Sequence, residues 1–205
     1  MRGSSGIGSG RRQPPRTATR WPFALLCAMA AAPALAHSPF GADALFWEGA
    51  WHLFLAPLAL AAVVGIGLAC AGGPLEQEIE LASLAGLTCC LVAWQLPAGP
   101  VATWLAPLSI AAVGLGAVLA IPPTPWRTRP LALLAGLGAG AAIELDTRTA
   151  VAAAGAGAAM LVTSIWMLAL AVRLQRRWPL ALRVAGAWIV ALSLLLLALA
   201  MRGLR

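Results

Sequence analysis

The sequence predicts an all-α membrane protein, a polytopic bundle of about six transmembrane helices that follows a signal peptide. The 205-residue chain is 61% hydrophobic and only 10% charged, whereas soluble domains carry about 25% charged residues. Its mean hydropathy is +0.86, and several apolar stretches approach or exceed the roughly 20 residues that cross a bilayer as a helix. Strand-like alternation is absent, and lipid offers backbone groups no hydrogen-bond partner, so helices are the expected spanning element.

The first 36 residues have the three parts of a secretory signal. Residues 1–20 are polar and arginine-rich, residues 21–33 form a short apolar run, and "ALA" at 34–36 has the small-x-small form of a signal peptidase site. We therefore expect cleavage after Ala36, which divides the chain into a signal peptide, 1–36, and a six-helix transmembrane domain, 37–205. An uncleaved first helix is the alternative. Cleavage would make His37 the amino terminus, where an imidazole and an α-amine together can chelate a metal ion.

Six apolar segments follow the signal. They end at proline, glycine or charged residues, as helix ends do, and cover 45–71, 79–97, 101–121, 130–146, 149–173 and 179–201. Cleavage places the new N-terminus outside the cytoplasm, so the loops at 122–129 and 174–178 would be cytoplasmic. Five arginines lie at these two loops and three lie at the outer loop and tail. The positive-inside rule therefore favours this orientation. The expected location is the bacterial inner (cytoplasmic) membrane, crossed several times.

Charge distribution excludes nucleic acid as a partner. The formal net charge is +7, but five arginines precede the first apolar run. The rest of the chain has nine arginines against seven acids, without the clustered basic face of a nucleic-acid-binding protein. The lipid bilayer is the expected surrounding, and the small-residue runs at 135–142 and 152–159 predict close packing of the fourth and fifth segments.

Scarce ionisable residues inside the predicted spans are the candidate functional groups, because a charge in lipid is costly unless it is satisfied. Glu48 and His52 are four residues apart, so they share one face of a helix. The carboxylate could orient the imidazole or bind a metal ion with it. Pro57 interrupts the hydrogen bonding of the same segment and frees the Leu53 carbonyl. A simple interfacial pair beside a kink is the alternative.

A second acidic pair, Glu144 and Asp146, ends the fourth segment. In the orientation above, that end lies on the same membrane side as Glu48, His52 and His37. Imidazole and carboxylate together suit a weak, exchangeable divalent transition-metal site. The alternative is a helix end that meets Arg148. No serine–histidine–acid set or nucleotide motif is present, so we expect neither an enzyme nor a permanently bound cofactor.

Two motifs resemble those of the HupE/UreJ family. The signal ends in "AHSP" at 36–39, and "GAWHLFLAP" at 49–57 resembles the family's G-x-x-H-x-x-x-x-P; residues 145–147 resemble its G-L-D-S at a helix end. The resemblance extends loosely over the whole chain and implies a permease for Ni²⁺ or Co²⁺ that serves hydrogenase or urease maturation. It implies His52 and Asp146 as metal ligands, and a homo-oligomer or a maturation protein as a partner.

The sequence departs from the family pattern after the helix histidine. Leu53 stands where the family has proline, and Ala59 stands where it has a second histidine. The alternative function is therefore a non-transporting membrane partner or assembly factor that has lost metal transport.

Overall fold

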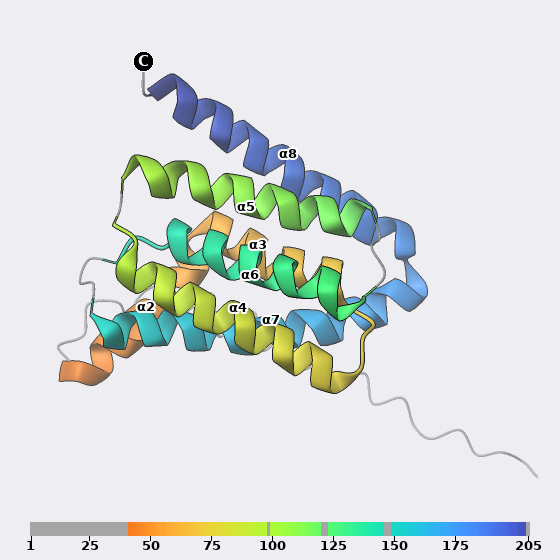
Figure 1. The fold of residues 1–205 in the computed structure, drawn as a ribbon, viewed down its shortest axis with the longest axis horizontal. Coiled ribbons are helices and arrows are strands. Elements are labelled where there is room, and N and C mark those ends of the chain that lie inside the picture. Colours follow the sequence, from red (N-terminus) through yellow and green to blue (C-terminus); the bar gives the residue numbers. More distant parts are fainter. Residues whose placement is uncertain (1–40, 98, 120–122, 146–148, 204–205) are drawn as a thin grey trace, which may run out of the picture. The chain divides into compact units, whose positions relative to one another are not determined.

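The structure is a computed structural model that describes residues 41–97, 99–119, 123–145 and 149–203. The signal peptide, its cleavage site at Ala36, and His37 lie outside these residues. Every described element of regular structure is a helix, and the helices run nearly end to end (Figure 1). They are α2 (Gly41–Leu55), α3 (Pro57–Cys70), α4 (Leu75–Gln95), α5 (Pro100–Val118), α6 (Pro125–Ala142), α7 (Ala150–Arg177) and α8 (Pro179–Gly203).

Prolines and glycines determine the helix boundaries. Four helices, α3, α5, α6 and α8, begin with proline, which is favoured there because the first N–H of a helix has no internal partner. The turn between α3 and α4 passes through Gly72, whose φ of 100° is a left-handed conformation that glycine adopts without a Cβ penalty. Each predicted segment is therefore helical, but the first is split into two helices.

Three helices are long and apolar enough to cross a membrane, namely α5, α7 and α8, and the bent pair α2 and α3 raises the number to four if it is one span. These spans agree with a helical membrane protein, but among the described residues they are fewer than the six predicted. The two remaining helices, α4 and α6, carry charge at one end. Helix α4 has three glutamates among its first six residues, and α6 has two arginines among its first five.

Helix α4 lies between the two helices that are rich in small residues. Gly86 of α4 meets Gly157 of α7, since a Cβ on Gly86 would lie 2.8 Å from the Gly157 carbonyl oxygen. On the other side, a Cβ on Gly140 of α6 would lie 2.6 Å from the Cys89 carbonyl oxygen. The two runs at 135–142 and 152–159 do allow close packing, as predicted. Each run packs closely against α4, however, and not against the other run.

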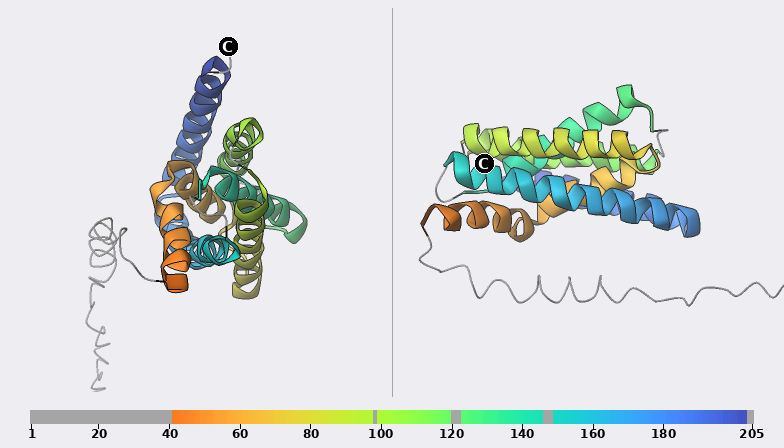
Figure 2. Two further views of the ribbon diagram at one scale, coloured as in Figure 1. Left: turned by 90° about the vertical axis from the view of Figure 1, so that its left-hand side faces the viewer. Right: turned by 90° about the horizontal axis from the view of Figure 1, so that it is seen from below.

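The surface of the described residues is apolar, as in a protein surrounded by lipid. Trp166 of α7 and Trp188 of α8 are 63% and 65% exposed. Helix α8 packs mainly along α5 and leans away from the other helices toward its C-terminus (Figures 1 and 2). Lipid contact is the natural environment for these side chains, because an apolar surface of this extent would be unfavourable in water.

Candidate functional site at the break between α2 and α3

The first apolar segment is broken at Ala56. Helices α2 and α3 meet at an angle of 76°. Hydrogen bonds continue up to the break, where the Ala56 N–H donates to the His52 carbonyl at 3.1 Å, and resume after it, where the Leu60 N–H donates to the Ala56 carbonyl at 3.1 Å. Pro57 has no N–H to donate to Leu53, and its ring cannot pack against that carbonyl in a continuous helix. Pro57 therefore explains the missing hydrogen bond at the break, but Pro107 and Pro130 lie inside continuous helices, so the bend also depends on packing.

The ring of His52 is held by the main chain. Its Nδ1 lies 2.8 Å from the backbone carbonyl oxygen of Glu48. A carbonyl oxygen only accepts hydrogen bonds, so Nδ1 is the donor, and in the neutral tautomer of the ring Nε2 then has the lone pair. A histidine whose second nitrogen is fixed in this way has the arrangement seen in metal ligands. The Glu48 carboxylate makes no hydrogen bond or ion pair with a described residue, so the main chain of Glu48, not its carboxylate, orients the ring.

A close helix crossing fixes the position of α2. A Cβ on Gly49 would overlap the carbonyl of Ala152 in α7, and a Cβ on Gly155 would overlap the carbonyl of Phe46 in α2. Reciprocal glycines of this kind let two backbones touch. The turn of α2 that carries Glu48 and His52 is thereby pressed against the beginning of α7.

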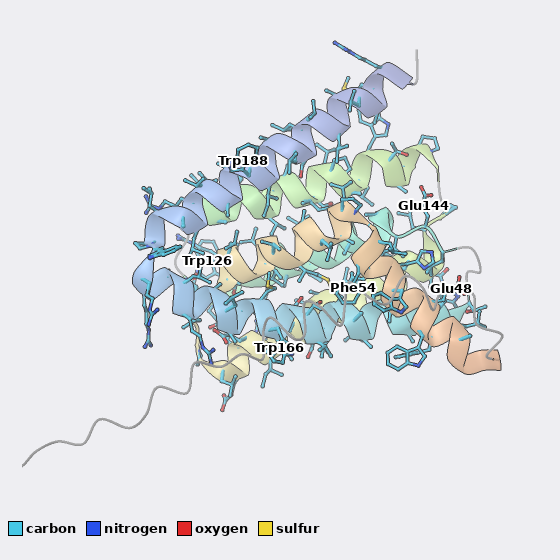
Figure 3. The ribbon with its side chains drawn as sticks, turned by 180° about the vertical axis from the view of Figure 1, so that it is seen from behind. Glu48, Phe54, Trp126, Glu144, Trp166 and Trp188 are labelled. Atoms are coloured by element: carbon cyan, nitrogen blue, oxygen red, sulfur yellow. The ribbon has the colours of Figure 1, made fainter. Side chains whose placement is uncertain are left out.

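A cavity of about 380 Å³ opens beside the break. Ala56, Pro57 and Leu58 form one wall, and the ends of α4, α6 and α8 and the beginning of α5 form the others. Its walls are mainly apolar, with Thr103 and the exposed Glu144 as polar side chains. His52 lies one turn before the break and is not among the lining residues. Figure 3 places Glu48 and Glu144 at the same end of the bundle, which we call the break end.

The predicted site residues are only partly described. Glu48 and His52 lie on one turn of α2 and are half-buried, whereas His37 and Asp146 lie outside the described residues. Among the residues that the structure describes, no three histidine, cysteine, aspartate or glutamate side chains come together as a metal site. Ala59 is fully buried in the helical core.

The opposite end of the bundle carries a polar network that the sequence analysis did not predict. The Gln77 side chain of α4 donates from Nε2 to Thr128 Oγ1 of α6 at 3.0 Å and to the Pro123 carbonyl at 3.3 Å. Thr128 is fully buried, and its hydroxyl donates in turn to the Thr124 carbonyl at 3.1 Å. A buried glutamine side chain must find hydrogen-bond partners. The only sequence signal for this network was the polar run "EQE" at 76–78, in which Gln77 stands between two glutamates.

The same end holds most of the charge, and we call it the arginine end. Glu80 and Arg129 form an exposed ion pair at 2.7 Å between α4 and α6, and this hydrogen bond and charge raise the pKa of Arg129. Glu80 therefore has a specific partner on a neighbouring helix. All arginines in the described part of the chain except Arg202 lie here: Arg127, Arg129, Arg173, Arg176, Arg177 and Arg183.

No family model matches the chain, and no curated protein or solved structure matches it either.

Proposed function

We propose that this protein is an inner-membrane permease that takes up a divalent transition metal, Ni²⁺ or Co²⁺, from the break end. The observation that carries the proposal is the position of the His52 ring, whose Nδ1 lies 2.8 Å from the Glu48 carbonyl oxygen, so that Nε2 of the neutral ring is the nitrogen we propose as the metal ligand. The resemblance of "AHSP" and "GAWHLFLAP" to the HupE/UreJ family supports the choice of metal and a role in supplying hydrogenase or urease maturation.

The break in the first span supports the same proposal. Transporters often bind substrates where a spanning helix is interrupted, because unwound backbone is tolerated where it lines a cavity. Here the interruption at Ala56 borders a cavity of about 380 Å³, and His52 lies one turn before it. Asp146 and His37 are proposed as the further ligands, with Glu48 beside them. The metal is the cargo, and no permanently bound cofactor is proposed.

The arginine distribution supports the direction of transport. With most arginines at the arginine end, the positive-inside rule places that end in the cytoplasm and the break end outside. The proposed protein thus crosses the inner membrane with six segments and binds metal on its outer side.

Metal accumulation in cells tests the proposal. Cells that express the wild type should accumulate more Ni²⁺ or Co²⁺ than cells with empty vector, measured by mass spectrometry of washed cells. His52→Ala should reduce that excess at least tenfold, because it removes the ligand nitrogen. Leu55→Ala is the matched control, since Leu55 is 62% exposed on the same helix. Equal accumulation by wild type and His52→Ala, at equal membrane levels, would remove His52 from the mechanism.

A second variant separates two roles of Glu48. Glu48→Gln keeps the backbone carbonyl that holds the His52 ring, so it changes only the carboxylate. A loss of accumulation comparable to that of His52→Ala assigns the carboxylate to the metal. Unchanged accumulation restricts the contribution of Glu48 to its main chain.

The second candidate function is a non-transporting membrane partner or assembly factor. It is favoured by Ala59, which occupies the place of the family's second histidine and is fully buried in the core. Purified protein that shows no Ni²⁺ or Co²⁺ binding at micromolar concentrations by calorimetry, and that co-purifies with a metalloenzyme maturation protein, would support this function instead.

A further inference from the structure

The arginine end contains a groove that the proposed transport does not use. It has a volume of about 630 Å³ and lies between the α3–α4 turn at Gly72 and Gly73 and the last two turns of α7. Five residues of α7 line it, Ala169, Val172, Arg173, Gln175 and Arg176, and the spacing of all but Gln175 places them on one helix face. The groove is amphipathic: Ala169, Val172 and Leu75 provide an apolar wall, and the two arginines provide its charged rim.

The charges of the groove leave its arginines without a carboxylate partner. Among the described residues the ion pair of Glu80 with Arg129 is the only one, so neither Arg173 nor Arg176 forms a direct ion pair with a described carboxylate. Glu78 is the one acid that lines the groove, and its Oε1 accepts a hydrogen bond from the Gly72 N–H at 3.4 Å. Two guanidinium groups are therefore available to an anion, and guanidinium forms bidentate hydrogen bonds with phosphate.

The length of α7 places this groove at the level of lipid headgroups. The helix has 28 residues, which at about 1.5 Å per residue gives roughly 42 Å. The hydrocarbon core of a bilayer is about 30 Å thick, so about two turns of α7 extend beyond it. The turns of α7 that carry Arg173 and Arg176 are charged, so they are the turns expected outside the hydrocarbon core. The apolar wall of the groove continues from them toward the membrane.

We infer that this groove binds an anionic phospholipid, with its headgroup phosphate between Arg173 and Arg176 and the start of an acyl chain along Val172 and Leu75. Charge complementarity selects the anionic headgroup, and the apolar wall selects a lipid over a free phosphate ion. The inference is independent of metal transport, because none of these residues lies at the break end.

Native mass spectrometry of the full chain in detergent tests the inference. With equal added amounts of phosphatidylglycerol and phosphatidylcholine, the wild type should retain phosphatidylglycerol at least fivefold more. The double variant Arg173→Gln/Arg176→Gln should reduce that ratio to about one. Arg173→Lys/Arg176→Lys keeps the charges and should retain most of the preference.

The matched control removes the same charge outside the groove. Arg177→Gln/Arg183→Gln lies at the same end, and neither residue lines the groove, so this variant should keep the wild-type ratio. An equal loss in both double variants, or an unchanged ratio in Arg173→Gln/Arg176→Gln, would overturn the inference. Inorganic phosphate at millimolar concentration should not displace the lipid; displacement would assign the groove to a free anion instead.

Discussion

The crossing of α2 and α7 gives a sharp prediction for the substitution Gly155→Ala. The added Cβ would overlap the Phe46 carbonyl oxygen and would lie 2.8 Å from its carbon and 3.1 Å from the Ala50 nitrogen. All three neighbours are main-chain atoms, so no side-chain rotation can relieve the overlap. Helix α2, which carries His52, must move away from α7.

The expected cost follows from two opposing terms. Overpacking of a close-packed contact costs about 1 to 3 kcal/mol, and the upper part of this range applies because backbone must move. Alanine is more favourable than glycine within a helix by about 1 kcal/mol. The net destabilisation is therefore about 1 to 2 kcal/mol, which lowers the melting temperature of a chain of this size by about 2 to 8 °C.

Thermal unfolding of the detergent-solubilised protein, followed by tryptophan fluorescence, measures this shift. Gly99→Ala is the matched control, since a Cβ at Gly99 has nothing within 4 Å, and its melting temperature should stay within about 1 °C of the wild type. Gly155→Ala should also lower metal accumulation in cells if His52 acts as proposed, because α2 is displaced. A melting temperature for Gly155→Ala equal to that of the wild type would refute the close crossing.

Two further predictions concern the arginine end and the N-terminus. Thr128→Val removes the hydroxyl that Gln77 contacts at 3.0 Å and should destabilise the protein by about 1 to 2 kcal/mol, because a buried amide loses a partner. Thr163→Val should cost less, since that hydroxyl bonds only to carbonyls of its own helix; equal melting temperatures for the two variants would contradict the network. N-terminal sequencing of the membrane-inserted protein should begin at His37, and a sequence beginning before Ala36 would reject the proposed cleavage.

The positions of the helices were accessible from the sequence because prolines and glycines mark their ends. The size of the break at Ala56 was not accessible. Pro57 requires an interruption, but the angle of 76° depends on where α3 packs, and α3 contacts α5, α6 and α7, all of which come later in the chain. Sequence patterns report local geometry, whereas an angle between helices is set by long-range packing.

Packing partners illustrate the same limit. The small residues at 135–142 and 152–159 predicted close approach, and close approach is found at Gly140 and Gly157. Small residues permit contact with any neighbour, so the pattern could not identify α4 as the helix that lies between the two runs. Gln77 was overlooked for a similar reason, since only the fold brings its amide to Thr128.

The helix face shared by Glu48 and His52 was predictable from the sequence, but the hydrogen bond that holds the ring was not. The spacing of Glu48 and His52 predicted a shared helix face, and the structure has it. The sequence offered the carboxylate as a group that could orient the ring or bind a metal ion, whereas in the structure the backbone carbonyl of Glu48 holds the ring. Every helical histidine has a carbonyl four residues before it, so the pattern itself cannot distinguish the two. The contributions of His37 and Asp146 remain predictions.

The two ends of the bundle differ in a way that bears on the proposed direction of transport. At the arginine end, Gln77, Thr128 and the Glu80–Arg129 pair connect α4 to α6 through polar contacts. At the break end, the same two helices border a cavity beside Pro57. In the proposed uptake, a cation would enter at the break end, where the cavity is open and His52 lies one turn before the break, whereas polar contacts hold α4 and α6 together at the arginine end. If the protein transports metal between these two helices, as one form of the proposal has it, the Gln77–Thr128 hydrogen bond would have to break in a second conformation.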